Sequence, residues 1–427
     1  MLFNAFLKLT LLALACTNVH SQVLQPKCSS IFTRKNVNNV SGNEWNMIKN
    51  VLNQMQKDGH IARLAGLHDR LNYYIHGNPM FLPFHRRLTQ DFEEIGRKYD
   101  PNFFIPFWNA ANDFRAPEKN VLFSPSNLGG NGNPMGGDCV KNGVLQGWTM
   151  SYPNLHCLRR KFMGASDQLP TWYSPEFITS IIQTSNSYDN FRNNLESSLH
   201  AVVHTGIGGD MATLWSPNDF IFYLHHANID RIWWKWQNAK QNSLMRYDGP
   251  SRASRGAANL NDILPDYGER VGDVMALGYG KMCYMYEDTN ALNRLLEDNP
   301  LLAQNNTTPD SLSVVTREGE FVNFRNSVAY RRFRSLSNST ISKFFPAIAE
   351  GNFNANLFEM NDQKANLRAI SQDELEVTGG TMLPVPSDVP DEFIEMHQMD
   401  KNEVNEVTAR MKELANALNT EGYISPN

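Results

Sequence analysis

Apolar residues recur at helical spacing in four stretches of the chain. Over residues 41–75 they return every three or four positions, behind a Ser-x-x-Glu pattern that resembles a capping box. After a break at "HGNP" the same spacing predicts a second helix from near Pro83. A third helix is expected over about 188–205, ending at the glycines of "GIGGD", and a fourth over about 218–240. The pattern therefore predicts a mainly α fold built on an antiparallel four-helix bundle.

Outside these stretches the helical spacing is lost. Residues 115–160 are rich in Gly, Asn and Pro and read as a long surface excursion. After about Asp288, "EDNPLLAQNNTTPDS" reads as a linker, and short mixed segments and a charged helix near 402–418 follow it. We therefore expect one helical domain over residues 22–290 and a C-terminal extension of unclear fold over 291–427.

The first 21 residues predict a secretory signal peptide. A short apolar run is followed by small residues where a signal peptidase cleaves, which predicts cleavage near Gln22. A membrane anchor would need about 20 apolar residues, and Lys8 and Asn18 interrupt this run. The mature protein is therefore expected to be secreted.

Secretion decides how the cysteines are interpreted. Four remain after the signal, and in an oxidising compartment they favour two disulfides with three possible connectivities. We expect Cys139–Cys157 within the loop region and Cys28–Cys283 between the N-terminus and the end of the helical domain. Four possible N-glycosylation triplets agree with secretion and begin at Asn39, Asn305, Asn306 and Asn338.

Composition excludes other classes of function. With 41% apolar and 19% charged residues the chain is expected to fold as a globular protein with a sizeable core. A net charge of -5 without a basic stripe argues against a nucleic-acid partner. Beyond the signal, no apolar stretch is long enough to predict a membrane span. The chemistry must then come from particular side chains.

Histidines provide that chemistry in the third predicted helix, within "ESSLHAVVH". His200 and His204 are four residues apart and share a face with Glu196. Such a pair on a protein surface is common by chance. The flanking Leu and Val residues instead predict a mostly buried helix, where unpartnered histidines are costly.

Three more histidines lie in "HDRLNYYIHGNPMFLPFHRR". His68 and His85 fall on the inward faces of their helices, with His76 in the loop between them. A lone histidine on an apolar face is usually a core residue, but three within 18 positions favour a common ligand. Together with one histidine of "FYLHHANID", six imidazoles suit copper, although ligand type alone does not exclude zinc or iron. Two three-histidine sites on four helices predict a dinuclear centre.

Two motifs resemble the tyrosinase, catechol oxidase and hemocyanin family, whose members carry type 3 dinuclear copper. "HGNPMFLPFHRRLTQDFE" is similar to the family's first copper motif and "NDFIFYLHHANIDRIWWKWQ" to its second. With "HAVVHTGIGGDM" the resemblance covers residues 60–240. "GYGKMCYMY" resembles the tyrosine-containing segment that ends the catalytic core in fungal members. The joint order of these motifs is specific.

The resemblance implies two copper ions and their ligands. In the family the second histidine of the adjacent pair binds copper, which selects His226 over His225, with Asp230 as a supporting residue. His60 lies upstream on the same helix as His68 and remains an alternative to it. The implied ligands are His68, His76 and His85 for one ion and His200, His204 and His226 for the other.

The chain departs from the family pattern at several positions. Ala201 stands where many monophenol-hydroxylating members have an asparagine that, with a glutamate, orients a water. Glu196 is either that catalytic glutamate or a solvated or capping carboxylate. We therefore expect diphenol oxidation to outweigh monophenol hydroxylation. Thr213 occupies the position that gates substrate entry in relatives, and its small side chain predicts an open pocket. Phe220 replaces a usual proline and Asn109 a usual aspartate.

The resemblance implies copper-dependent oxidation of phenols or o-diphenols to o-quinones with dioxygen, a tyrosinase or catechol oxidase activity that can serve melanin formation. The alternatives are a hemocyanin-like oxygen carrier without turnover and a copper-free scaffold. In fungal relatives a C-terminal extension covers the active site until proteolysis removes it. Residues 291–427 are a candidate for such a shield.

Overall fold

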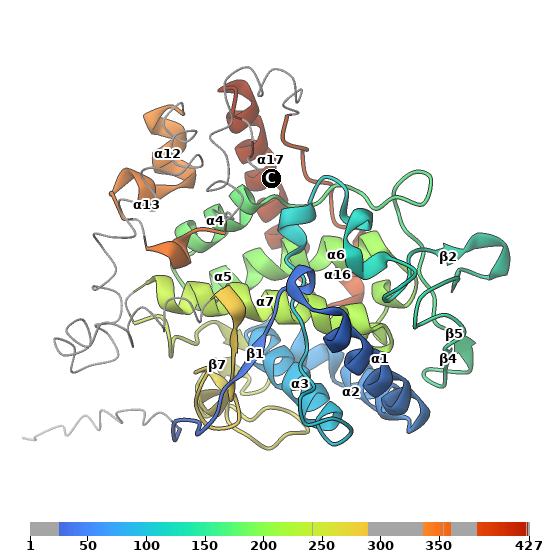
Figure 1. Ribbon diagram of the computed structural model, residues 1–427. Coiled ribbons are helices and arrows are strands. Elements are labelled where there is room, and N and C mark those ends of the chain that lie inside the picture. The colour runs from blue at the N-terminus through green and yellow to red at the C-terminus, as the bar shows by residue number, and fades with distance from the viewer. Residues whose placement is uncertain are drawn as a thin grey trace, which may run out of the picture.

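The computed structural model describes residues 25–240, 242–288, 336–352, 354–359, 382–423 and 425. Within these ranges the protein is mainly helical (Figure 1), which confirms the predicted fold class. None of the described helices is long and apolar enough to cross a membrane. The predicted signal peptide and the predicted linker lie outside the described residues.

Four helices form the central bundle: α2 (His60–Ile75), α3 (Phe81–Gly96), α6 (Ala201–Ile207) and α7 (Phe220–Ala239). Helix α7 is buried on nearly every side, because α3 and segments outside the bundle, among them Ala355–Leu357 of the C-terminal extension, pack around it. Helix α1 (Gly42–Lys57) precedes the bundle and begins at a capping box formed by Ser41 and Glu44. The sequence predicted one helical stretch here, but Gly59 adopts φ +78 and separates α1 from α2.

The third predicted helix is continuous in space but not uniform. It consists of α5 (Tyr188–Leu195), a π-helical turn (Glu196–His200) and α6. Such wide turns often occur at functional sites because they redirect side chains within a helix. Helix α4 (Pro175–Thr184) precedes it and was not predicted.

Short strand pairs and two disulfides connect the segments outside the helical bundle. Strand β1 (Phe32–Arg34) pairs in parallel with β8 (Tyr284–Tyr286), next to the Cys28–Cys283 disulfide. The Cys139–Cys157 disulfide closes the loop region, so both predicted pairings are confirmed. The other pairs are antiparallel: β2 (Gly132–Asn133) with β3 (Cys139–Val140), β4 (Thr149–Met150) with β5 (His156–Cys157), and β6 (Pro250–Ser251) with β7 (Gly256–Ala257).

The described parts of the C-terminal extension include four α-helices and lie against the bundle domain (Figure 1). They contain α12 (Asn338–Phe344), α13 (Pro346–Ala349), α16 (Asp391–Met396) and α17 (Lys401–Thr420). Helices α12 and α13 lie near α4, and α17 runs beside α5 and the π-helical turn. The buried Glu359 carboxylate accepts hydrogen bonds from Asn109 (2.8 Å) and Lys235 (3.0 Å), which anchors the extension.

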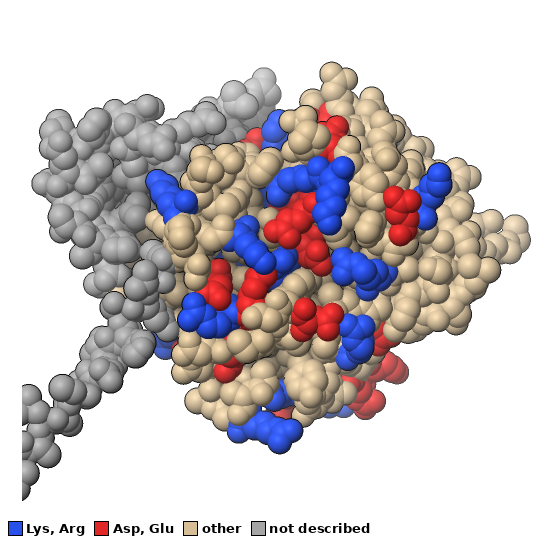
Figure 2. Space-filling model, turned by 90° about the horizontal axis from the view of Figure 1, so that it is seen from below, with Lys and Arg blue, Asp and Glu red and all other residues tan. Residues whose placement is uncertain are grey.

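Charged side chains of both signs alternate on the face shown in Figure 2. Lys and Arg residues there stand next to Asp and Glu residues, and neither sign gathers into a continuous patch. This face therefore offers no extended field of one sign to a charged partner.

Candidate metal centre

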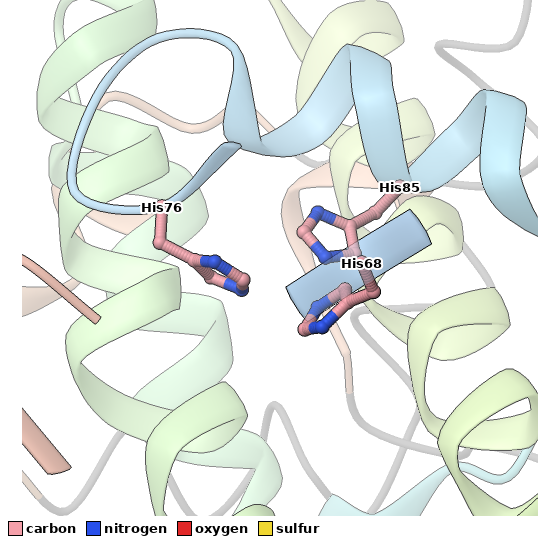
Figure 3. A group of neighbouring side chains, drawn as sticks. All are labelled: His68, His76 and His85. Carbon is pink, nitrogen blue, oxygen red and sulfur yellow. The ribbon is translucent and has the colours of Figure 1, made fainter. Parts of the chain in front are cut away.

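Six buried histidines converge at the middle of the bundle in two triplets. Within each triplet the candidate ligand atoms all lie within 4.8 Å of one another. Figure 3 shows the first, where side chains from α2, the following loop and α3 point toward a common point. The second comes from the π-helical turn, α6 and α7. The triplets are His68, His76 and His85, and His200, His204 and His226.

The two triplets face each other closely. The rings of His85 and His226, one from each triplet, stack with centroids 4.3 Å apart and an interplanar angle of 12°. The Nε2 atoms of His204 and His226 lie 3.4 Å apart. Both atoms belong to the second triplet. The Nε2 lone pair of His204 accepts a hydrogen bond from His226 in one tautomer, and in the other tautomer both lone pairs are open to a cation. The arrangement fits two adjacent metal ions.

Backbone carbonyls fix the orientation of most of these rings. When Nδ1 donates its proton to a carbonyl, Nε2 keeps its lone pair and can bind a metal. The buried Nε2 atoms of His68, His85 and His200 have no hydrogen-bond partner among the described residues. A metal ion would satisfy these orphaned nitrogens. The Nδ1 contacts are His68 to Leu214 (2.6 Å), His85 to Phe81 (2.7 Å), His204 to Met211 (2.6 Å) and His200 to Glu196 (3.3 Å).

Burial keeps the triplets uncharged. Loss of solvation lowers the pKa of His68 and the pKa of His204 to about 4. It lowers the pKa values of the other four histidines well below the ordinary value, and neighbouring imidazoles add to the shift. Neutral imidazole is the form that binds metals, so no proton competes for these sites at neutral pH.

Two other candidate histidines lie outside the triplets. His225 is buried, and its ring stacks on that of His200 with centroids 5.7 Å apart. Adjacent residues of a helix point about 100° apart, which separates His225 from its neighbour His226. His60 is partly exposed at the start of α2, and its ring centroid lies 6.1 Å from that of Tyr99. The geometry therefore groups His68 and His226, rather than these two, with the other candidate ligands.

A buried ion pair fastens the helices that carry His85 and His226. The Asp230 carboxylate, one turn after His226, accepts a hydrogen bond from Arg86, the residue after His85, at 2.5 Å. It also accepts hydrogen bonds from the hydroxyls of Tyr284 (2.6 Å) and Tyr286 (2.5 Å). Asp230 thus connects α3, α7 and β8 behind the stacked pair of rings.

Glu196 supports the loop that carries His76. One carboxylate oxygen accepts the backbone N–H of Gly77 at 2.8 Å, and the other accepts Arg192 at 3.1 Å. Burial raises the pKa of Glu196 to about 7, against the opposing effects of Arg192 and the Gly77 N–H. Both oxygens are engaged in positioning contacts, beside His76 rather than free in a pocket.

The two residues expected at the substrate entrance differ in their surroundings. Ala201 is fully buried and packs in an apolar cluster with residues of the extension, among them Val389, Phe393 and Met399. Thr213 is partly buried, and its hydroxyl donates to the Asp210 carbonyl at 2.7 Å. Thr213 also borders a cavity of about 320 Å³ in the loop region.

The extension brings one further histidine to the centre. His397, at the end of α16, is 1% exposed, and its ring centroid lies 4.5 Å from that of His76. Sequence reasoning missed it, because it is a single histidine without a second one at helical spacing. The signal that could have found it is its place in "DEFIEMHQMD", where Phe393 and His397 are four residues apart on one helical face.

Comparison with known proteins agrees with this architecture. Residues 58–239 match the common central domain of tyrosinase. The tyrosinase of Streptomyces lincolnensis is 37% identical over 177 residues, which cover 38% of this chain and 64% of that protein. The tyrosinase of Streptomyces glaucescens is 32% identical over 209 residues, which cover 45% and 74%. A polyphenol oxidase variant from Thermothelomyces thermophila shares the fold, with a TM-score of 0.50 at 22% identity, covering 61% of this chain and 90% of that one. The chain belongs to the tyrosinase family.

Proposed function

We propose that each histidine triplet holds one copper ion and that the protein is a type 3 copper polyphenol oxidase, which oxidises o-diphenols to o-quinones with dioxygen. The observation that carries the proposal is the pair of facing, all-imidazole triplets, each with its candidate ligand nitrogens within 4.8 Å of one another. Imidazole ligands suit copper, and this family supplies the precedent for two such ions. Two bound copper ions would supply the binding of dioxygen and the exchange of electrons with the phenol.

The protein's own contribution is orientation and exclusion of water. The ring centroid of Phe222 lies 4.2 Å from that of His226 and 5.2 Å from that of His68. The Phe81 ring packs against the rings of His85 and His200. These apolar side chains keep water away from both triplets. A dry shell of this kind controls the polarity around a metal site and hence its redox properties.

Diphenols are the proposed preferred substrates. A monophenol must lose its proton before it can be hydroxylated, which calls for a base near the entering hydroxyl. Ala201 has no polar side-chain atom, and both oxygens of Glu196 are engaged by Gly77 and Arg192. The chain therefore lacks a free water-orienting pair at these two positions, and we propose that Glu196 acts by positioning His76.

The proposed function also assigns a role to each part of the chain. We propose that residues 22–290 form the catalytic domain and that the extension over 291–427 shields it. In support, Ala201 lies under α16, and the Asn72 side chain on α2 donates to the Met396 carbonyl at 2.7 Å. Two disulfides suit an oxidising compartment and support secretion after removal of residues 1–21.

Oxygen uptake by the copper-loaded chain tests this function. We expect the protein to consume oxygen faster with an o-diphenol than with the matched monophenol, because Ala201 and the engaged Glu196 provide no free water-orienting pair. Limited proteolysis of the extension should raise the rate, since α16 covers the centre.

Each result has a defined meaning. Equal rates on both substrates would overturn the substrate preference, and equal rates before and after proteolysis would overturn the shield. Two bound copper ions without turnover in either state would contradict the oxidase and favour an oxygen carrier.

A further inference from the structure

His397 approaches the centre from a side that both triplets border. Its ring centroid lies 4.5 Å from that of His76, in the first triplet. It lies 6.3 Å and 6.4 Å from those of His200 and His204, in the second triplet. The rings of His76 and His200 are themselves 6.1 Å apart. His397 thus adds an imidazole that borders both triplets, whereas His225 lies beside the second triplet.

The orientation of His397 matches that of the proposed copper ligands. Its Nδ1 donates to the Phe393 carbonyl at 3.0 Å, as the Nδ1 of His85 donates to the Phe81 carbonyl one turn earlier. This contact leaves a lone pair on Nε2, which is buried and has no hydrogen-bond partner among the described residues. The Phe393 ring stacks on the imidazole at 3.8 Å and restricts its rotation.

The chain segment that carries His397 is held firmly against the loop of His76. Arg252 donates to the carbonyls of both His76 (2.9 Å) and Gln398 (2.7 Å) and so connects the two segments. At Gly77, where φ is +60, an added Cβ would lie 2.4 Å from the Gln398 carbonyl oxygen. Only glycine permits so close an approach at this position.

A purely steric cover does not explain these features. An apolar side chain such as phenylalanine would fill the same space without leaving a polar atom unsatisfied. A buried nitrogen without a partner costs free energy. Five other buried histidines have an Nε2 atom without a partner among the described residues. Four of them, His68, His76, His85 and His200, belong to the triplets, where a metal ion would satisfy them, and the fifth is His225 beside His200.

We propose that His397 is a seventh metal-binding imidazole of this centre, supplied by the C-terminal extension. The proposal rests on the proposed function, because it requires copper in the triplets. Nε2 of His397 would occupy a coordination position that the oxygen of a phenol needs. Substrate could bind only after this nitrogen–metal bond breaks and α16 moves away, so the extension would act as an internal competing ligand.

The test compares the full chain with two variants after anaerobic loading with Cu(I). His397→Phe keeps a ring of similar size but removes the nitrogen. Met399→Leu alters the same buried segment by a change that cores usually tolerate, and it keeps His397. Copper per chain, Cu(I) affinity by competition with a chelator, and the ¹⁵N shift of His397 Nε2 in histidine-labelled protein are measured.

We expect all three proteins to bind two Cu(I) ions. His397→Phe should lower the Cu(I) affinity by at least about tenfold, because even the loss of a residue that only orients a metal ligand typically costs this much. Met399→Leu should have the same Cu(I) affinity as the parent. In the parent, copper should shift the His397 Nε2 resonance, which is identified by its absence in His397→Phe.

The outcomes separate the two proposals. Two bound ions with an unshifted His397 resonance, or with unchanged affinity in His397→Phe, would overturn the seventh ligand and leave the proposed function intact. Failure of the parent to bind two ions would overturn both.

Discussion

Replacing His226 by asparagine should remove the copper ion of the second triplet and abolish the oxidation of catechols. The Nε2 atom of His226 lies 3.4 Å from that of His204 and completes that triplet. Two imidazoles alone leave a poorly held ion, so we expect the affinity of this site to fall by more than about 100-fold, beyond the usual effect of losing an orienting partner. Copper per chain after dialysis, measured by mass spectrometry, should drop by half.

The adjacent histidine provides a matched control. His225→Asn changes an equally buried position one residue away on α7, but His225 belongs to neither triplet. We expect this variant to retain both copper ions after the same dialysis. Loss of copper from His225→Asn with full retention by His226→Asn would reverse the assignment of the pair.

Asp230→Asn should strongly lower the free energy of unfolding of the protein. The substitution keeps the shape of the side chain but removes the negative charge that faces Arg86 and the Arg34 guanidinium 3.7 Å away. Breaking a buried ion pair by removing one partner typically costs about 3–5 kcal/mol, because the other charge stays buried and uncompensated. We expect a decrease of this size in the free energy of unfolding of the copper-free protein, measured with a chemical denaturant.

An exposed ion pair serves as the reference for this prediction. Asp266 pairs with Arg70 at 2.9 Å, and their side chains are 48% and 60% exposed. Asp266→Asn should therefore change the free energy of unfolding by no more than about 1 kcal/mol. Similar effects of the two substitutions would show that the Asp230 network does not stabilise the bundle.

The helices of the bundle were predictable because their signals are local. Apolar spacing along the chain indicated the helical stretches, and the Ser41–Glu44 capping box marked the start of α1. The break at Gly59 was missed, because the apolar spacing continues across it. Helix α4 was missed because its 10 residues are too few to repeat an apolar period convincingly.

In the candidate site, too, local motifs were predictable and contacts between distant segments were not. The six histidines of the triplets stand in short motifs. Their spacing indicated His76, His85, His200 and His204, while the family resemblance was needed to select His226 over His225 and to favour His68, with His60 left as an alternative. The contacts of the extension are not local: the Asn72–Met396 hydrogen bond joins residues 324 positions apart. No pattern within "DEFIEMHQMD" reveals that His76 is its neighbour.

The structure explains why position 109 differs from the family pattern. Asn109 stands where an aspartate is usual, and its amide donates to the buried carboxylate of Glu359. The same carboxylate pairs with Arg231 and Lys235 on α7. An aspartate at position 109 would place two carboxylates side by side, so the asparagine suits an extension that brings its own negative charge.

Anomalous diffraction at the copper edge tests most directly whether each histidine triplet holds one copper ion. Crystals of the copper-loaded full chain should show two anomalous peaks, one among the Nε2 atoms of His68, His76 and His85 and one among those of His200, His204 and His226. A single peak, or peaks located away from these nitrogens, would contradict the account.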